Sequence, residues 1–299
     1  MRDLIGHTPL VKINYAFEQV EGVNLFAKLE YYNPSGSVKD RTGLYMVEDA
    51  IKDGRLKRGS TIVEATAGNT GLGVAFAALN QGFHVIFVVP EKFSEEKQIL
   101  MKALGADIIH TKREDGMLGA AAKAQELLSE IKDSISLQQF KNMSNPKAHY
   151  ETTGPEIYQD LDGKIDYLVA GAGSGGTYSG VVKFLKEKNS NIKGILADPV
   201  GSTMGGGEHA DYDIEGIGND FIADTMDMSL VDKVIKINDT QAFDGARALA
   251  RHEGILGGSS TGAAFSAALK LIYEHHVKGN IVFIAPDRGD RYFSKHLYA

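Results

Sequence analysis

Cysteine is absent from this chain of 299 residues. Disulfides, thiolate metal sites and cysteine nucleophiles are therefore excluded, although the absence by itself does not fix the redox compartment. No stretch reaches the roughly 18 unbroken apolar residues of a membrane span, and the segment from Met1 to Pro9 lacks a basic region followed by a long apolar core. We therefore expect a soluble, cytoplasmic protein without a membrane partner.

Positive charge is also scarce: 32 Lys and Arg residues stand against 39 Asp and Glu residues. Proteins that follow nucleic-acid phosphates carry clustered Lys and Arg, so nucleic acid is not an expected partner. The nine histidines contain no H-E-x-x-H pattern, and His275-His276 is only an adjacent pair. We predict no metal site and expect the histidines at the surface. Ser259 and Ser260 lack the G-x-S-x-G setting of a hydrolase nucleophile.

Short β-branched runs alternate with helix-period segments, a pattern typical of parallel sheets with helical crossovers. Because 299 residues exceed the usual size of one compact core, we predict an α/β protein with two such units that meet near Asn142 to Pro146. The predicted strands are Leu25 to Glu30, Thr61 to Thr66, His84 to Pro90, Asp107 to Thr111, Ser134 to Phe140, Asp166 to Ala170, Lys193 to Asp198, Val234 to Ile237 and Asn280 to Ala285. The main predicted helices are Gly68 to Gln81, Ser94 to Leu104 with Ser94 as N-cap, Gly116 to Ile131, Tyr178 to Lys188 and Ala263 to Lys270.

Lys39 lies in the run Asn33-Pro34-Ser35-Gly36-Ser37-Val38-Lys39-Asp40-Arg41, where a predicted strand passes through turn residues into a helix. The apolar face of that helix is expected at Leu44, Val47, Ala50 and Ile51. Taken alone, a lysine at a helix start is most often a solvated charge. A lysine that forms a Schiff base needs a lowered amine pKa, which burial, a cationic neighbour or the helix N-terminus can provide. Two anion-binding loops elsewhere in the chain favour the Schiff-base interpretation.

The first of these loops, Gly173 to Thr177, connects a strand to a helix and offers free backbone N–H groups to a phosphate. With Gly171 it also satisfies G-x-G-x-x-G, and Asp198 follows the next strand, where the ribose-binding acid of a dinucleotide fold lies. An NAD(P)-dependent oxidoreductase that uses Gly171 to Gly176 is therefore the main alternative. Close backbone packing is the simpler explanation of such a turn.

The second loop, Thr66 to Gly71, adds hydroxyls and an amide that suit a carboxylate. Helix capping accounts for about one of those polar residues. The turn Gly257 to Gly262 also precedes a helix, but capping by itself explains its hydroxyls. One lysine and two anion loops together suggest a phosphorylated cofactor bound through an amine.

The chain resembles the fold-type II, pyridoxal 5'-phosphate-dependent family of cysteine synthases and cystathionine β-synthases over essentially its whole length. The matching motifs are Ile5 to Leu10, Asn33 to Arg41, Thr66 to Gly71, Met101 to Ala106, Thr152 to Ile157, Gly173 to Thr177, Glu215 to Gly218 and Gly258 to Gly262. The resemblance implies two tryptophan synthase β-like domains in a homodimer. Residues 1–38 and 146–299 form the larger, cofactor-phosphate-binding domain, and residues 39–145 form the smaller, mobile domain.

The resemblance also implies roles for single residues. Lys39 carries the internal aldimine, Asn69 contacts the ring oxygen of the cofactor, and Ser260 faces the pyridine nitrogen. Gly173, Ser174, Gly175, Gly176 and Thr177 bind the phosphate, and the substrate is bound by Thr66, Ala67, Gly68, Thr70, Gln139 and Gly216. A hydroxyl at the pyridine nitrogen leaves the ring less electron-withdrawing than a carboxylate does, which favours loss of a β-leaving group over transamination. Lys39 is the natural base for the α-proton.

The implied reaction is β-replacement or β-elimination through an α-aminoacrylate. Its first substrate is O-acetyl-L-serine, L-cysteine or L-serine, and its nucleophile is sulfide, a thiol such as homocysteine, or water. Ala67 stands where the family usually has serine, which removes one hydrogen-bond donor near the substrate. Here the chain is similar to a bacterial branch of O-acetylserine-dependent cystathionine β-synthases. A non-catalytic relative that keeps the cofactor pocket is a further alternative.

Asp224 is the last candidate residue. It follows Gly201 to Ile222, a connection so long that we predict a functional loop. We hypothesise that Asp224 receives a proton from the incoming nucleophile or anchors its amino group. A carboxylate that activates water would convert cysteine to serine with release of hydrogen sulfide. The alternative is a solvated loop acid.

Overall fold

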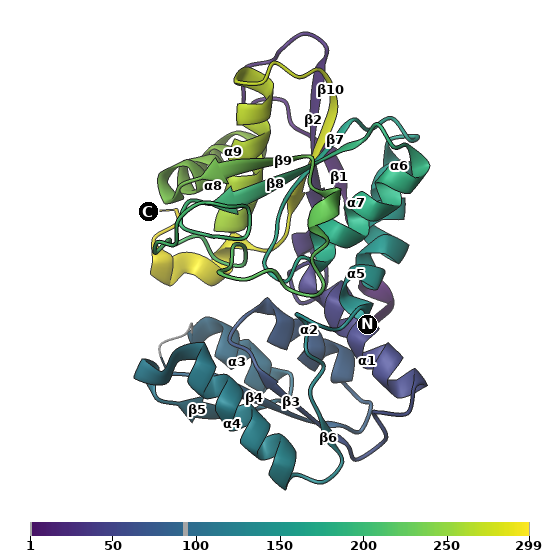
Figure 1. Ribbon diagram of the computed structural model, residues 1–299, viewed down its shortest axis with the longest axis vertical. Coiled ribbons are helices and arrows are strands. Elements are labelled where there is room, and N and C mark those ends of the chain that lie inside the picture. The colour runs from purple at the N-terminus through teal and green to yellow at the C-terminus, as the bar shows by residue number, and fades with distance from the viewer. Residues whose placement is uncertain (1, 92–94, 299) are drawn as a thin grey trace. The chain divides into compact units, whose positions relative to one another are not determined.

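The computed structural model describes residues 2–91 and 95–298, which form two compact units (Figure 1). The smaller unit contains residues 2–5 and 39–145, and the larger contains residues 6–38 and 146–298. The sequence had assigned residues 1–38 to the larger domain. Residues 2–5 instead group with the smaller unit, where the Arg2 guanidinium donates a hydrogen bond to the carbonyl of Ala77.

The smaller unit contains a parallel sheet with the strand order β5-β4-β3-β6. Its strands are β3 (Thr61–Ala65), β4 (His84–Pro90), β5 (Asp107–Thr111) and β6 (Ser134–Ile135), and its helices are α1 (Lys39–Lys52), α2 (Asn69–Ala78), α3 (Glu95–Ala103), α4 (Gly116–Glu130) and the short η1 (Arg2–Leu4) and η3 (Arg113–Asp115). Ile62, Val74 and Phe87 are fully buried in its core. The predicted N-cap, Ser94, lies outside the described residues.

Two predictions for this unit were wrong in detail. The strand predicted from Ser134 to Phe140 ends at Ile135, and Gln138, with a φ of 53°, lies outside the extended conformation of a strand. The apolar face of α1 is narrower than expected. Met46, Val47 and Ala50 are buried, whereas Ile51 is 37 % exposed near the end of the helix.

The direction of the strand order reverses at β3 in the smaller unit. From β3 the chain passes through α2 and α3 to β4 and β5 on one side, and α4 then leads to β6 on the other side. Ligands of such sheets bind beyond the carboxyl ends of the strands at this reversal. In the smaller unit those ends lead into Thr66–Gly71 after β3 and into residues 136–139 after β6.

The larger unit contains a six-stranded sheet with the order β1-β2-β10-β7-β8-β9, in which β1 alone is antiparallel to its neighbour. Its strands are β1 (Leu10–Lys12), β2 (Val23–Leu29), β7 (Tyr167–Gly171), β8 (Lys193–Pro199), β9 (Lys233–Ile237) and β10 (Gly279–Ala285). Its helices are α6 (Gly154–Asp160), α7 (Gly176–Lys188), α8 (Asp239–Glu253), α9 (Ser259–Tyr273), the π-helix η4 (His149–Thr153) and the short η2 (Glu30–Tyr32), η5 (Met228–Leu230) and η6 (Gly289–Lys295), while α5 (Ser144–Ala148) crosses the boundary between the units.

Alternate residues of the larger sheet are buried under different helices. Val169 and Phe283 belong to the apolar cluster of α9, where the Phe265 and Phe283 rings are 5.6 Å apart, and Leu168 and Val282 belong to the cluster of α7. The strand order reverses between β7 and β10. The loop Gly171–Thr177 and residues 286–288 therefore follow the strand ends where a ligand is expected.

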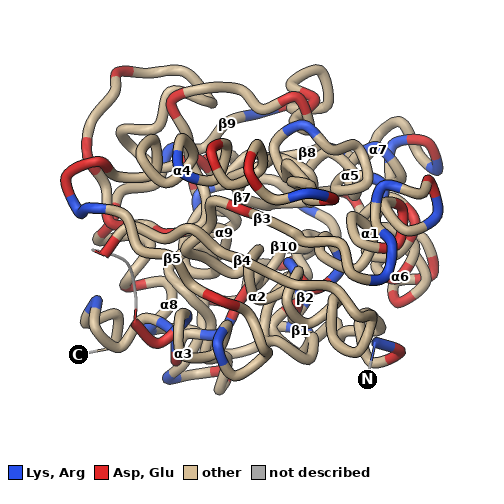
Figure 2. Tube along the Cα trace, turned by 90° about the horizontal axis from the view of Figure 1, so that it is seen from below, with Lys and Arg blue, Asp and Glu red and all other residues tan. Residues whose placement is uncertain are grey.

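Acidic and basic residues are interspersed along the Cα trace (Figure 2), and the sequence contains no long basic run. Within residues 2–91 and 95–298, no helix is both long and apolar enough to cross a membrane. Residues 201–222 form turns, bends and irregular backbone between β8 and β9, as the sequence predicted for a long loop.

Candidate active site

Lys39 is the first residue of α1 and directly follows a segment that is fixed to the larger sheet. The backbone N–H of Val38 donates to the carbonyl of Pro286 at 2.7 Å, and Ser37 pairs with Asp287, both just beyond the carboxyl end of β10. Consecutive Cα atoms lie about 3.8 Å apart. The chain is therefore attached to the larger sheet, beyond the carboxyl end of β10, up to Val38, the residue directly before Lys39.

Lys39 also contacts α2 through its backbone. A Cβ atom added to Gly73 would lie 2.2 Å from the Lys39 carbonyl oxygen, and one added to Gly43 would lie 2.4 Å from the Gly73 carbonyl carbon. Helices α1 and α2 can approach this closely only because both positions are glycine. Asn69, the first residue of α2, lies about one helical turn before Gly73. Lys39 and Asn69 thus belong to the same tightly packed corner of the smaller unit.

The loop from Thr66 to Gly71 combines buried hydroxyls with an open helix N-terminus. Thr66 and Thr70 are buried, and the Thr70 hydroxyl donates to the Gln139 side-chain carbonyl at 2.6 Å. Gly68 caps α2, and a Cβ atom added there would meet no atom within 4 Å. The first N–H groups of a helix have no acceptor inside the helix and carry partial positive charge. The loop can therefore hold a carboxylate beside Gln139.

The loop from Gly173 to Thr177 is shaped by backbone contacts. A Cβ atom at Gly173 would lie 2.6 Å from the Gly216 carbonyl oxygen, and one at Gly175, whose φ is +82°, would lie 2.7 Å from the Met226 Cα. Helix α7 begins at Gly176, so its first N–H groups lie within this loop. A loop of bare backbone donors at a helix N-terminus fits the phosphate of pyridoxal 5'-phosphate.

The hydroxyl of Thr177 is held by a residue that sequence reasoning missed. His149 is fully buried, its Nε2 lies 3.2 Å from the Thr177 Oγ1, and its Nδ1 lies 2.9 Å from the Thr153 Oγ1. The expectation that the histidines lie at the surface was therefore wrong for His149. The available sequence signal was the position of His149 just before the motif Thr152 to Ile157. In the structure His149 lies in a π-helix, a geometry common at functional sites.

The second half of the long loop is tied to the phosphate loop. The Gly218 N–H donates to the Ala172 carbonyl at 2.8 Å, and the Asn219 side-chain amide donates to the Gly173 carbonyl at 2.5 Å. Gly216, with a φ of +86°, therefore lies next to Gly173. Asp224 is exposed, but the hydroxyl of the next residue, Thr225, donates to the carbonyl of Ser174.

Ser260 lies in the first turn of α9 and is buried. The preceding residue, Ser259, accepts a hydrogen bond from the Glu215 N–H at 3.0 Å, and the cap residue Gly258 donates to the Asp287 carbonyl at 3.1 Å. The start of α9 is therefore linked both to the long loop and to the end of β10.

The comparisons with known proteins identify the family. The model of the family described as pyridoxal-phosphate dependent enzyme matches residues 1–287 of this chain. The chain belongs to this family. It is a pyridoxal-phosphate-dependent enzyme of α/β fold, as the sequence predicted.

Three relatives place the chain within the family. An O-acetylserine dependent cystathionine β-synthase of Bacillus subtilis is 50 % identical over 296 residues, which cover 99 % of this chain and 96 % of the relative. A cysteine synthase of Helicobacter pylori is 44 % identical over 302 residues, covering 100 % and 98 %. The crystal structure of a hydrogen sulfide-producing enzyme from Fusobacterium nucleatum matches with a TM-score of 0.92 and 41 % identity, covering 97 % and 98 %. The relatives are consistent with pyridoxal-phosphate-dependent β-replacement.

The dinucleotide alternative is not favoured. Asp198, the expected ribose-binding acid, is buried and bound by the ammonium group of Lys236 at 2.5 Å and by the Gly205 N–H at 3.0 Å. This carboxylate anchors the start of the long loop instead. Among the residues that the structure describes, no group of three or more His, Asp or Glu side chains is placed to hold a metal ion.

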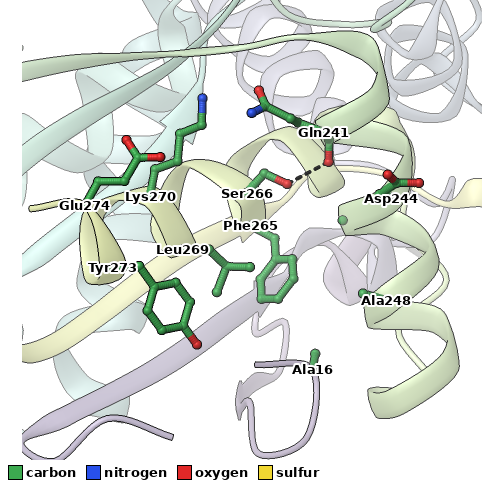
Figure 3. Close-up of a pocket in the computed structure, with 11 residues that line it drawn as sticks. Ala16, Gln241, Asp244, Ala248, Phe265, Ser266, Leu269, Lys270, Tyr273 and Glu274 are labelled. Carbon is green, nitrogen blue, oxygen red and sulfur yellow. Dashed lines mark hydrogen bonds between the residues drawn. The ribbon is translucent and has the colours of Figure 1, made fainter. Parts of the chain in front are cut away.

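A separate surface pocket of about 420 Å³ lies between α8 and α9 (Figure 3). Phe265, Leu269 and Ala16 form its apolar part, and Ser266 closes one side by donating to the Gln241 carbonyl at 2.7 Å. The ammonium group of Lys270 donates to the Lys236 carbonyl at 2.9 Å. None of the predicted site residues lines this pocket, and we assign it no part in the chemistry.

Proposed function

We propose that this enzyme catalyses β-replacement or β-elimination on O-acetyl-L-serine, L-cysteine or L-serine. The nucleophile is sulfide, a thiol such as homocysteine, or water. The relatives support this class through their names, which include cystathionine β-synthase and cysteine synthase. One observation carries the proposal. Each sheet has an anion-binding loop where its strand order reverses, and Lys39 comes directly after Val38, whose backbone is hydrogen-bonded to Pro286 beyond the end of β10 in the larger sheet.

In this proposal, the cofactor is held by Gly173 to Thr177 and Ser260 of the larger unit and by Lys39 and Asn69 of the smaller unit. Gly173 to Thr177 would bind its phosphate, and the Ser260 hydroxyl would donate a hydrogen bond to the unprotonated pyridine nitrogen. Lys39 would supply the amine that holds the cofactor aldehyde, and the Asn69 side chain would hold the ring oxygen. The bound cofactor supplies an electron sink for a carbanion at the substrate α-carbon. A neutral hydroxyl at the ring nitrogen restrains that sink and favours loss of a β-leaving group.

The smaller unit binds the substrate carboxylate in this proposal. The N–H groups and hydroxyls of Thr66, Gly68 and Thr70 face the carboxylate together with Gln139, while Gly216 adds backbone from the long loop. The Lys39 amine takes the α-proton once substrate has displaced it. Ala67 offers no hydroxyl, so substrate orientation depends more heavily on Thr70 and Gln139. We propose that residues 39–145 move as a domain that excludes water from bound substrate.

Reduction with borohydride tests the covalent attachment. We expect the purified holoenzyme to lose its cofactor absorbance on reduction. The reduced cofactor should then remain attached, as a covalent label, to the peptide that contains Lys39. Lys39→Ala should abolish turnover of O-acetyl-L-serine with sulfide and with homocysteine, while its folded content stays as in the wild type. A label on another lysine, or turnover by Lys39→Ala, would contradict the proposal.

We further propose that Asp224 orients or deprotonates the nucleophile. Its neighbour Thr225 is hydrogen-bonded to Ser174, which supports a location beside the phosphate loop. If Asp224 activates water, Asp224→Asn should lower serine formation from L-cysteine far more than cysteine formation from O-acetyl-L-serine. Unchanged turnover with every nucleophile would leave Asp224 as a solvated acid.

Finally, we propose that the enzyme is a homodimer, as its resemblance to the family implies, and that it is located in the cytoplasm. Size-exclusion chromatography with light scattering measures the mass directly, and a mass of one chain would contradict the dimer. The cytoplasmic location is tested by fractionation of cells that produce the protein.

A further inference from the structure

Glu64 lies on β3 where the pairing of β3 with β6 stops. The two strands pair only at Thr61 with Ser134 and at Ile62 with Ile135. Two residues further along β3, the Glu64 carboxylate accepts hydrogen bonds from the Ser136 hydroxyl at 3.0 Å and from the backbone N–H groups of Leu137 and Gln138, the latter at 3.2 Å. A side chain thus replaces the backbone ladder just where the chain leaves the sheet.

The segment held by Glu64 carries Gln139. Gln138 adopts a φ of 53°, a conformation that costs energy for a residue with a side chain and persists only where the surroundings enforce it. Immediately after it, the Gln139 side-chain carbonyl accepts from the Thr70 hydroxyl at 2.6 Å, and its backbone carbonyl accepts from the Asn145 side-chain amide at 2.9 Å. The turn is therefore held on one side by Glu64 and on the other by Thr70.

Glu64 and Thr70 belong to one continuous piece of chain. They stand six residues apart, before and after the turn into α2, and both contact the segment from Ser136 to Gln139. The hydrogen-bond donors that the structure shows for Glu64 are a hydroxyl and two amides, all neutral. All three donors converge on one side-chain oxygen, Oε1, so a single acceptor atom of Glu64 organises the segment.

We propose that Glu64 is a positioning residue for the substrate site. Its carboxylate fixes the turn at residues 136–138 and thereby holds the Gln139 amide against Thr70, in the geometry that receives the substrate carboxylate. The inference rests on the proposed function, because it takes Thr70 and Gln139 as carboxylate-binding residues. Glu64 acts through Gln139 and does not itself touch the substrate.

Kinetics of four variants test this role: Glu64→Ala, Glu64→Gln, Gln139→Ala and the double variant Glu64→Ala with Gln139→Ala. We expect Glu64→Ala to raise the KM for the amino-acid substrate about tenfold while kcat changes less than about threefold, because uniform binding is lost. Glu64→Gln keeps one carbonyl acceptor and should recover part of the loss. In the Gln139→Ala background, Glu64→Ala should raise KM no further, because the two residues act through one contact.

A structural readout that needs no turnover accompanies the kinetics. Amide hydrogen exchange of a peptide that covers residues 134–142 should be faster in Glu64→Ala, since the N–H groups of Leu137 and Gln138 lose their acceptor. Asp232→Asn serves as the matched control. The Asp232 carboxylate also accepts a hydrogen bond from a backbone N–H group, that of Gly194 near the start of β8, at 2.8 Å. Asp232→Asn should leave KM and this peptide unchanged. If Glu64→Ala does not fold, Glu64→Gln and Ser136→Ala provide the same comparison.

Each outcome decides the inference. An unchanged KM in the Glu64 variants, or multiplicative effects of Glu64→Ala and Gln139→Ala, would overturn the positioning role while the proposed function stands. A wild-type enzyme that binds cofactor but neither turns over nor binds these amino acids would overturn the proposed function. In that case the exchange experiment still decides whether Glu64 fixes the turn, and unchanged exchange would overturn that link as well.

Discussion

The two strand-to-helix loops of this enzyme have similar glycine content but different surroundings. In the larger unit, side chains at Gly173 and Gly175 would collide with the backbone of Gly216 and Met226. In the smaller unit, a side chain at Gly68 would meet nothing within 4 Å, and one at Gly71 would meet the flexible end of Met101 at 2.7 Å. The loop of the larger unit is locked by backbone, whereas that of the smaller unit is open and lined by side chains.

This difference matches the proposed tasks of the two loops. A phosphate is the same in every catalytic cycle, so a cradle fixed by backbone contacts can be complementary to it at all times. Substrates and products with different side chains share only the α-carboxylate, and a loop lined by movable side chains can receive each of them. On this proposal, the rigid loop Gly173 to Thr177 suits a cofactor that stays bound, and the open loop Thr66 to Gly71 suits substrates and products that bind and leave.

The largest effect is expected from Gly173→Ala. The new methyl group would have to displace the Gly216 carbonyl, which lies 2.6 Å away and belongs to the backbone. Such overpacking costs about 3 kcal/mol at its upper range, which corresponds to roughly 100-fold weaker cofactor binding. Titration of the apoenzyme with pyridoxal phosphate measures this loss. Binding within twofold of the wild type would show that the loop is not locked by backbone.

A second variant tests the rigid corner of the smaller unit. In Gly73→Ala, the new Cβ atom would lie 2.2 Å from the Lys39 carbonyl oxygen, so α1 and α2 must separate. The better helix propensity of alanine offsets part of the cost, and we expect a net destabilisation of about 2 kcal/mol. Hydrogen exchange of peptides from α1 and α2 localises the effect. Equal protection in wild type and variant would contradict the close contact.

Sequence reasoning found the loops but not what holds them. Glycine spacing and strand-to-helix order were sufficient to locate Thr66 to Gly71 and Gly173 to Thr177, because such turns depend on local conformation. The links made by His149 and Glu64 join residues 28 and 72 to 74 positions apart. No local periodicity encodes partners at that separation. The prediction of a strand as far as Phe140 was wrong for the same reason, since the distant Glu64 carboxylate binds the backbone N–H groups of Leu137 and Gln138.

A smaller effect is expected from Gly68→Ala, the control for both glycine variants. The methyl group meets no protein atom, so folding and cofactor binding should remain as in the wild type. It does occupy space beside the N–H groups of α2, and we expect the KM for the amino acid to rise about fivefold, equivalent to roughly 1 kcal/mol. Steady-state kinetics beside a cofactor titration separate the two quantities. Loss of cofactor with an unchanged KM would reverse the assignment of the loops.

The smallest effects concern the acids of the two units, whose pKa values shift in opposite directions. Burial raises the pKa of Glu64 above its usual range, and its three neutral hydrogen-bond donors lower it only in part. Partial burial also raises the pKa of Asp232, but the Lys186 ammonium at 2.6 Å, the Gly194 N–H and Lys193 outweigh it, so the net pKa is lowered. Glu64 has neutral donors and Asp232 has cationic ones, and the signs follow from that difference.

The two acids should therefore give stability curves of opposite slope against pH. The stabilisation by Asp232 is fully present above its unfolded pKa of 3.8 and is lost as the pH falls through its lowered folded value, so Asp232→Asn should cost less at the acidic end. The stabilisation by Glu64 is present below its unfolded pKa of 4.5 and is lost as the pH rises through its raised folded value, so Glu64→Gln should cost less as the pH increases. Solvent screening keeps the Asp232 effect near 1 kcal/mol or below, roughly that of an exposed ion pair. Hydrogen exchange measured separately in each unit between pH 3 and pH 8 gives both curves, and slopes of the same sign would show that charge partners do not distinguish the two carboxylates.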